Sequence, residues 1–394
     1  MPTTAANSAG GSSVPFFRRN QVASLVPSSR DELHHLDILH SRLADSLQLL
    51  LLSPATAAGC SKAPAATGGS PKSPSADAAN TAFILSLPFL VKLLDAFLAC
   101  EADFESLLLL VLYRSPSLIS RPPVDRAVSD LLDRVIKALD LCNAVSLSVN
   151  SVRHWNRNAD TAASALQYQA PQLNRAKRAL SKLLLSAGAG LGSSSSLICR
   201  RTCRLCSATR QLQAMASGLA GFTGHAAPRG GESGSTSILA LALSTISYLM
   251  LFAMWAMVSA FPCGRPVQAP PAPAASTRQM PWAAALAELQ ESIVEQLRRE
   301  RRKELGVVPS AGMLAEIVAL ERSGREAMEA VSNGGETKVA AEELAEACRA
   351  MEDGLGPFET KVREVFHRLV RCREGLLRCF SEGSRSSPSP TPPL

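Results

Sequence analysis

The sequence contains few aromatic residues and lacks the series of short, β-branched segments that is typical of a β-sheet protein. Aromatic side chains make up 5% of the 394 residues although 46% of the chain is hydrophobic, and Leu and Ala supply most of the remainder. Leu and Ala favour helices, whereas β-branched and aromatic residues favour strands. These absences exclude a fold built on β-sheets and predict an all-α protein.

The cysteines lack the regular spacing of a disulfide framework. Ten cysteines are scattered through the chain, which predicts reduced thiols in the cytosol. Cys199, Cys203 and Cys206 come nearest to a metal motif, but structural zinc sites use four ligands and no second group follows. Their spacing places the three thiols on one helical face, which favours packing in the core. Because three arginines accompany them, S-acylation of these cysteines is a further alternative.

No group of residues is typical of a catalytic or cofactor-binding site. His34, His35 and His40 accompany Asp37 on the first predicted helix, where histidines are usually solvated. The Gly-x-Gly-x-Gly run at 188–192 lacks the preceding strand that a nucleotide-binding loop needs. We therefore expect a non-enzymatic protein with no cofactor, no metal and no small-molecule substrate.

The segment from Ile238 to Phe261 contains no charged side chain. A helix of about 20 apolar residues is long enough to cross a bilayer, but a helix that is apolar on every face is also typical of the centre of a large bundle. The flanking basic residues are Arg229 before the segment and Arg265 and Arg278 after it, so they favour neither alternative. The candidate membrane residues are Ile238, Leu243, Tyr248, Trp255 and Phe261.

The residues before the apolar segment show helical periodicity. Ser29 to Glu32 match a capping box that begins the first helix, and apolar residues then recur at spacings of three and four. Between 53 and 79 the composition changes to Pro, Ala, Gly and Ser, which predicts a disordered linker. We expect a disordered tail at 1–29 and an N-terminal helical bundle at 30–220.

The residues after the apolar segment predict a charged helical region at 281–380. Turn signals divide it into four helices, and the Glu and Arg residues on their polar faces predict a helical hairpin or coiled-coil-like packing. The last two predicted helices, 337–353 and 357–380, are separated by Gly354 to Pro357. The tail at 381–394 is expected to be disordered, with candidate phosphorylation sites at Ser387, Ser389 and Thr391.

Positive charge is concentrated in the middle of the chain. Residues 121–229 contain 15 Lys and Arg against 5 Asp and Glu, whereas residues 281–380 contain 15 against 18. A basic surface favours anionic partners. We expect a membrane surface with acidic lipids, or an acidic protein, and no nucleic acid.

The N-terminus lacks the apolar segment of a secretory signal, so we expect the region before the apolar segment to stay in the cytosol. The first thirty residues are rich in Ser, Ala and Thr and contain no acidic residue, which is typical of a disordered tail or of a plastid transit peptide. We expect a cytosolic, membrane-associated protein, single-pass if 238–261 spans the membrane. Plastid and endoplasmic reticulum are the alternatives.

Several stretches resemble one family of plant proteins. Residues 140–166, DLCNAVSLSVNSVRHWNRNADTAASAL, resemble the central helices of the ROH and BYPASS-like proteins, and the segment from Phe16 to Val22 is also similar. Residues 254–263, MWAMVSAFPC, resemble the apolar segment of that family, which ends in Pro-Cys. Residues 343–377 resemble its closing helices. The chain is similar to this family in these stretches. Its linkers at 53–79 and 262–276 are longer than those of the family.

The resemblance implies an all-α regulatory protein without catalytic residues. The ROH branch, which the Pro-Cys end favours, is similar to partners of the seventy-kilodalton class of exocyst subunit, in vesicle secretion and the deposition of cell-wall or seed-coat polysaccharide. The BYPASS branch, which restrains a root-derived mobile signal that controls shoot development, is the alternative. Contact with the partner is expected in the C-terminal helical region, at Phe358, Arg363, Phe366 and Arg371.

Overall fold

The computed structural model describes residues 27–52, 84–167, 172–188, 204–222, 234–262, 267–271, 273, 280–303 and 314–385. Every regular element in these ranges is a helix, which confirms the predicted all-α fold. The predictions for the linker at 53–79, for Cys199 and Cys203, and for Ser387, Ser389 and Thr391 fall outside the described residues.

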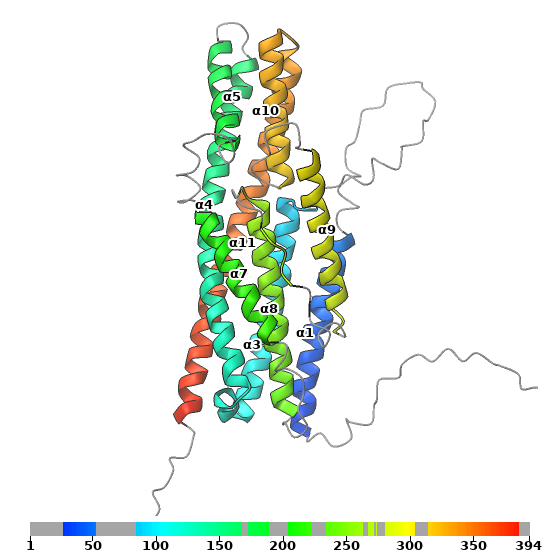
Figure 1. The fold of residues 1–394 in the computed structure, drawn as a ribbon, viewed down its shortest axis with the longest axis vertical. Helices are drawn as coiled ribbons and strands as arrows, with labels where there is room; N and C mark the ends of the chain where they lie inside the picture. The colour runs from blue at the N-terminus through cyan, green and yellow to red at the C-terminus, as the bar shows by residue number, and fades with distance from the viewer. Residues whose placement is uncertain are drawn as a thin grey trace, which may run out of the picture.

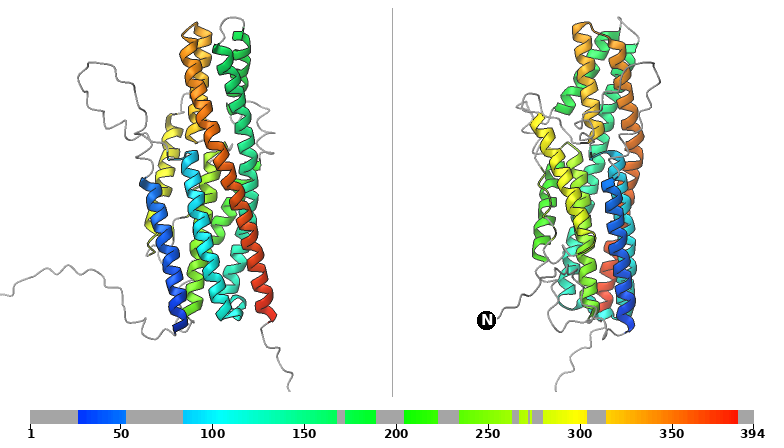
Figure 2. Two further views of the ribbon diagram at one scale, coloured as in Figure 1. Left: turned by 180° about the vertical axis from the view of Figure 1, so that it is seen from behind. Right: turned by 90° about the vertical axis from the view of Figure 1, so that its right-hand side faces the viewer.

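Two long helices run the length of the molecule. Helix α4 (Val124–Gln167, 44 residues) and helix α11 (Thr337–Arg385, 49 residues) would each extend about 65 to 75 Å at 1.5 Å per residue. They lie side by side in opposite directions (Figures 1 and 2), and the shorter helices pack around them. The pair therefore joins the two ends of an elongated bundle.

One end of the bundle consists of two helical hairpins. Helix α5 (Leu173–Gly188) follows α4, and helix α10 (Ala315–Asn333) precedes α11. Helix α5 contacts α4 and α10, while α11 contacts the same two helices (Figure 1). Gly334 adopts φ 69° and ends α10, because a residue without Cβ takes the left-handed conformation at low cost. Helices α10 and α11 thus form the predicted hairpin, and α11 continues into the other end of the bundle.

The other end surrounds the apolar helix α8 (Gly234–Ala260). Helices α1 (Pro27–Leu52), α3 (Leu87–Arg114), α4 and α7 (Arg204–Phe222) all pack against it. Helix α9 (Ala283–Lys303) lies against α1, and the side chain of its Gln296 accepts hydrogen bonds from the backbone amides of Ile84 and Leu85. The apolar segment is therefore the centre of this end.

Burial of α8 is nearly complete. Every residue from Ala242 to Phe261 is buried. By length and composition two described helices could cross a membrane, α8 and α4, and their apolar windows are 89% and 44% buried inside the structure. The arrangement of α8 is the one that the central-helix alternative predicts. The candidate membrane residues Ile238, Leu243, Tyr248, Trp255 and Phe261 all lie in the core.

Two buried polar side chains from neighbouring helices contact α8. His40 of α1 and the hydroxyl of Thr245 are 3.0 Å apart, and this hydroxyl donates its proton to the carbonyl of Leu241 at 2.9 Å. The hydroxyl therefore accepts from His40 Nε2, which carries a proton. Arg134 of α4 is 2% exposed and donates to Ser247 at 3.3 Å. Because an all-apolar helix has no preferred face, these contacts select its rotation within the bundle.

The predicted break at Gly354 to Pro357 is wrong, because α11 is continuous through it. A proline in a helix interior removes one hydrogen bond and costs about 3 kcal/mol. The buried stripe compensates for this cost, since Leu355, Phe358 and Val362 keep the three- and four-residue spacing across the proline and are all buried. Pro357 itself points to solvent.

Gly354 is expected to be required for the contact between α11 and α3. A Cβ there would lie 2.6 Å from Leu87 Cδ1 and 2.9 Å from Leu87 Cβ, whereas a Cβ at Gly375 would meet nothing within 4 Å. Gly354→Ala should lower the free energy of unfolding by about 1 to 2 kcal/mol through overpacking. Gly375→Ala should raise it by about 0.5 to 1 kcal/mol through helix propensity. Urea unfolding measures both, and equal stabilisation would contradict the close packing.

His40 is expected to make stability depend on pH. Burial lowers the pKa of His40 to about 4, from 6.5 in the unfolded chain. Between these values the unfolded state binds a proton that the folded state does not, so stability is complete above pH 6.5 and declines as the pH falls toward 4. The loss approaches about 3 kcal/mol. Urea unfolding across this range should show it for the native chain and not for His40→Gln, and parallel curves would contradict the assignment.

Candidate interaction face on helix α11

The C-terminal half of α11 is attached to the core along one stripe. Phe358 is fully buried, and its ring stacks on that of Phe261 with 5.6 Å between centroids. Val362, Val365 and Leu369 continue the buried stripe at helical spacing. Anchoring along its length gives α11 a fixed orientation, so its other faces have defined positions relative to the neighbouring helices.

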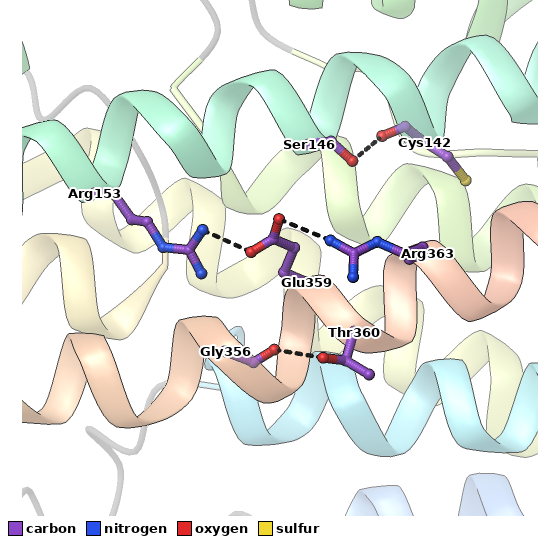
Figure 3. A network of polar contacts seen from close by, with 7 residues as sticks. All are labelled: Cys142, Ser146, Arg153, Gly356, Glu359, Thr360 and Arg363. Carbon is purple, nitrogen blue, oxygen red and sulfur yellow. Dashed lines mark hydrogen bonds and ion pairs between the residues drawn. The ribbon is translucent and has the colours of Figure 1, made fainter.

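Ionic contacts attach α11 to α4 on one side of the stripe. The carboxylate of Glu359 forms an ion pair with Arg153 of α4 at 2.6 Å and another with Arg363 of its own helix at 3.3 Å. Figure 3 shows the two guanidinium groups approaching the carboxylate from opposite sides. Nearer the start of α11, Asn156 of α4 donates to the carbonyl of Cys348 at 3.2 Å. This flank of α11 is occupied by contacts within the bundle.

A second set of ionic contacts attaches α11 to α3. Lys361 lies 2.8 Å from Asp95, and Arg368 pairs with both Glu101 and Glu105. Glu101 is 2% exposed, and burial raises the pKa of its carboxyl group while the bond to Arg368 opposes that rise. The buried carboxylate thus depends on Arg368 for compensation.

The remaining side of α11 faces solvent. Between the two flanks, exposed side chains recur at spacings of three and four. We refer to the following five residues as the α11 stripe: Arg363, His367, Arg371, Glu374 and Arg378. Arg371 and Arg378 form no ion pair with any residue in the described part of the chain. The stripe spans about 22 Å along the helix axis.

Charge is divided unequally along α11. Residues 336–359 contain seven acidic and two basic side chains, whereas residues 361–378 contain six basic and two acidic ones. This order complements the helix dipole, which is positive at the N-terminus and negative at the C-terminus. The C-terminal half therefore presents net positive charge to solvent on a rigid element, the arrangement that selects an anionic partner surface.

The four predicted interaction residues differ in their surroundings. Arg363 and Arg371 are exposed on the α11 stripe, Phe366 is half-buried against the core, and Phe358 is completely buried. His367 and Arg378 were not among the predicted residues, although their spacing of four and seven from Arg371 is a signal in the sequence that could have found them.

The other candidate sites were not brought together into a chemical centre. Cys206 lies in the first turn of α7. Among the described residues, no group of three or more His, Cys, Asp or Glu is arranged to hold a metal ion. His40 is buried in the bundle, and His34 and His35 contact each other with ring centroids 6.4 Å apart.

The fold and the α11 stripe define an elongated all-α protein that presents charged helical faces. Comparison of the sequence with known families shows which family the chain belongs to. The chain belongs to the ROH1-like family. The model of this family, described as Protein ROH1-like, matches residues 1–204 and 186–380.

Two relatives from Arabidopsis thaliana show how far the similarity extends. Protein ROH1A is 31% identical over 94% of this chain and 95% of its own length. Protein ROH1D is 32% identical over 74% of this chain and 82% of its own length. No solved structure matches the chain. The family resemblance inferred from the helical segments and the Pro-Cys end is thereby confirmed.

Loss of Arg368 is expected to destabilise the bundle more than loss of an exposed arginine. Arg368→Met leaves the Glu101 carboxylate buried without its cation, which should lower the free energy of unfolding by about 3 kcal/mol at neutral pH. Arg371→Met, at an exposed position, should change it by less than about 0.5 kcal/mol. The double variant Glu101→Gln/Arg368→Met should recover part of the loss in urea unfolding. Equal losses in the single and double variants would show that Arg368 contributes packing only.

Proposed function

We propose that this protein is a non-enzymatic regulator of vesicle secretion that binds an exocyst subunit of the seventy-kilodalton class through the α11 stripe. In this role it acts in the deposition of cell-wall or seed-coat polysaccharide. The proposal combines the family resemblance with one structural observation. That observation is the cationic stripe on α11, whose opposite side is fixed in the core.

The geometry favours binding of an acidic, folded protein surface. The stripe lies on a helix held by α3 and α4 on both flanks, so a partner pays little ordering cost when it binds there. Exposed arginines contribute mainly to the rate of association and to the choice of partner, because charges at the rim of an interface act through long-range attraction. The partner face is expected to be acidic where it meets Arg371 and Arg378.

The burial of α8 is consistent with a cytosolic site of action. A helix whose apolar surface is already covered by α1, α3, α4 and α7 has no need of lipid to satisfy it. We propose that the protein works in the cytosol at the surface of the membrane that receives secretory vesicles. The bundle is long enough to contact a tethering subunit at one end and a second surface at the other.

Charge reversal on the α11 stripe tests the proposal. Arg371→Glu/Arg378→Glu should weaken binding to the purified seventy-kilodalton exocyst subunit at least about tenfold, because two attractions become repulsions. The matched control is Lys338→Glu/Arg349→Glu, which makes the same charge change at exposed positions in the other half of the same helix. Its affinity should stay within about twofold of the native chain.

Titration calorimetry measures both affinities, and circular dichroism verifies that each variant is folded. Equal weakening by the two double variants would show that net charge, and not the stripe, governs the interaction. Unchanged binding of Arg371→Glu/Arg378→Glu would contradict the stripe as the binding face. A native chain that does not bind the subunit would contradict the proposed function.

A further inference from the structure

Helix α5 has an unusual distribution of charge. From Gln172 to Gly188 it contains four basic side chains and no acidic one. Its apolar side is covered, because Ala176, Leu180 and Leu183 are buried against α4 and α10. One side of α5 is thus packed in the bundle, and the basic side chains lie outside that packed side.

Three of the cations and one large apolar residue share the exposed side. Arg175, Arg178, Lys182 and Leu185 are exposed and follow one another at spacings of three, four and three, so they lie on one helical face. We call these four residues the α5 face. Leu185 is 71% exposed. No described residue forms an ion pair with the three cations of the α5 face.

Three other basic residues of the middle region are engaged by contacts within the bundle. Arg134 is buried and donates to Ser247, Lys137 pairs with Asp133 on its own helix, and Arg153 pairs with Glu359. These cations are engaged within the bundle. Four further cations, Arg121, Arg126, Arg157 and Arg210, are also exposed. The α5 face differs from them because it places three exposed cations on one side of a single helix within about two turns.

The same end of the bundle has opposite charge on α11. Helix α11 contacts α4 and α10, the two helices that also hold α5, and its first half carries seven acidic residues against two basic ones. An anionic surface would attract the α5 face and repel the first half of α11. This end of the bundle would therefore turn the α5 face toward an anionic surface and the first half of α11 away from it.

We propose that the α5 face binds the anionic lipid surface of a membrane. Clusters of four or more Lys and Arg on an amphipathic helix are typical of binding to acidic headgroups. Leu185 favours lipid over other polyanions, because a bilayer interface offers it an apolar environment beside the phosphate layer that attracts Lys182. This binding uses a different helix from the α11 stripe and does not depend on the exocyst partner.

The expected affinity is modest. Each cation near an acidic membrane contributes about fivefold to partitioning, so the three exposed cations contribute about a hundredfold. Insertion of Leu185 adds about tenfold. Binding of this strength is reversible and is weakened by salt, because surface charges are screened at distances beyond the Debye length.

Vesicle co-sedimentation of the full chain tests the proposal. Vesicles of phosphatidylcholine with phosphatidylserine should bind the protein, vesicles of phosphatidylcholine alone should not, and raised ionic strength should release it. Arg178→Gln/Lys182→Gln should reduce the partition coefficient about 25-fold, and Leu185→Gln about tenfold. The matched control Lys338→Gln/Arg349→Gln removes the same charge from α11 and should keep the native partition coefficient.

Three results would overturn the proposal. The first is equal binding to both kinds of vesicle. The second is an unchanged partition coefficient in the α5 variants while their circular dichroism matches that of the native chain. The third is a pair of results: Arg178→Gln/Lys182→Gln loses binding to duplex DNA or to an acidic protein, and Leu185→Gln leaves vesicle binding unchanged. Binding of the α5 variants to the exocyst subunit, measured in parallel, distinguishes failure of this proposal from failure of the proposed function.

Discussion

The architecture depends on the burial of a helix that is apolar on every face. Helix α8 would expose a large hydrophobic surface unless other helices covered all of its sides, and removal of such surface from water is the main driving force of folding. Four helices that precede α8 in the sequence, α1, α3, α4 and α7, supply that cover. Phe261 at the end of α8 also stacks on Phe358 of α11, so the same core connects the N-terminal and C-terminal helices. The bundle is organised outward from this helix.

Hydrophobic burial alone would leave α8 free to rotate and slide among its neighbours. Thr245 and Ser247 remove that freedom, because His40 and Arg134 hydrogen-bond to them from two different helices. A buried donor or acceptor that loses its partner costs free energy, so alternative rotations of α8 are disfavoured. Polar contacts inside the apolar core thereby specify a single arrangement.

With the core fixed from within, the surface is available for electrostatics. Helix α11 directs positive charge outward at the C-terminal end of the bundle, and α5 does so at the opposite end. The two cationic regions lie on different helices and far apart along the molecule (Figure 1). In the two proposals above, a protein partner and a lipid surface therefore occupy opposite ends of the bundle and can bind at the same time.

The helices could be predicted from the residues alone, because apolar periodicity and capping signals are local. The apolar spacing through Leu355, Phe358 and Val362 continues across Gly354 to Pro357, although Gly and Pro are typical of a turn, and α11 follows the spacing. Local propensity cannot include the packing of distant helices, and that packing compensates for the proline.

The exposure of individual charges depends on contacts between helices and could not be predicted from local sequence. Arg134, Arg153 and Arg178 are alike in the sequence, yet the first is buried, the second is paired with α11 and the third faces solvent. His40 was expected on a solvated face and lies against α8 instead. The apolar segment is compatible with lipid or with protein on composition alone, and the structure surrounds it with helices. Composition records what a side chain prefers, whereas contacts between residues distant in the chain decide what surrounds it.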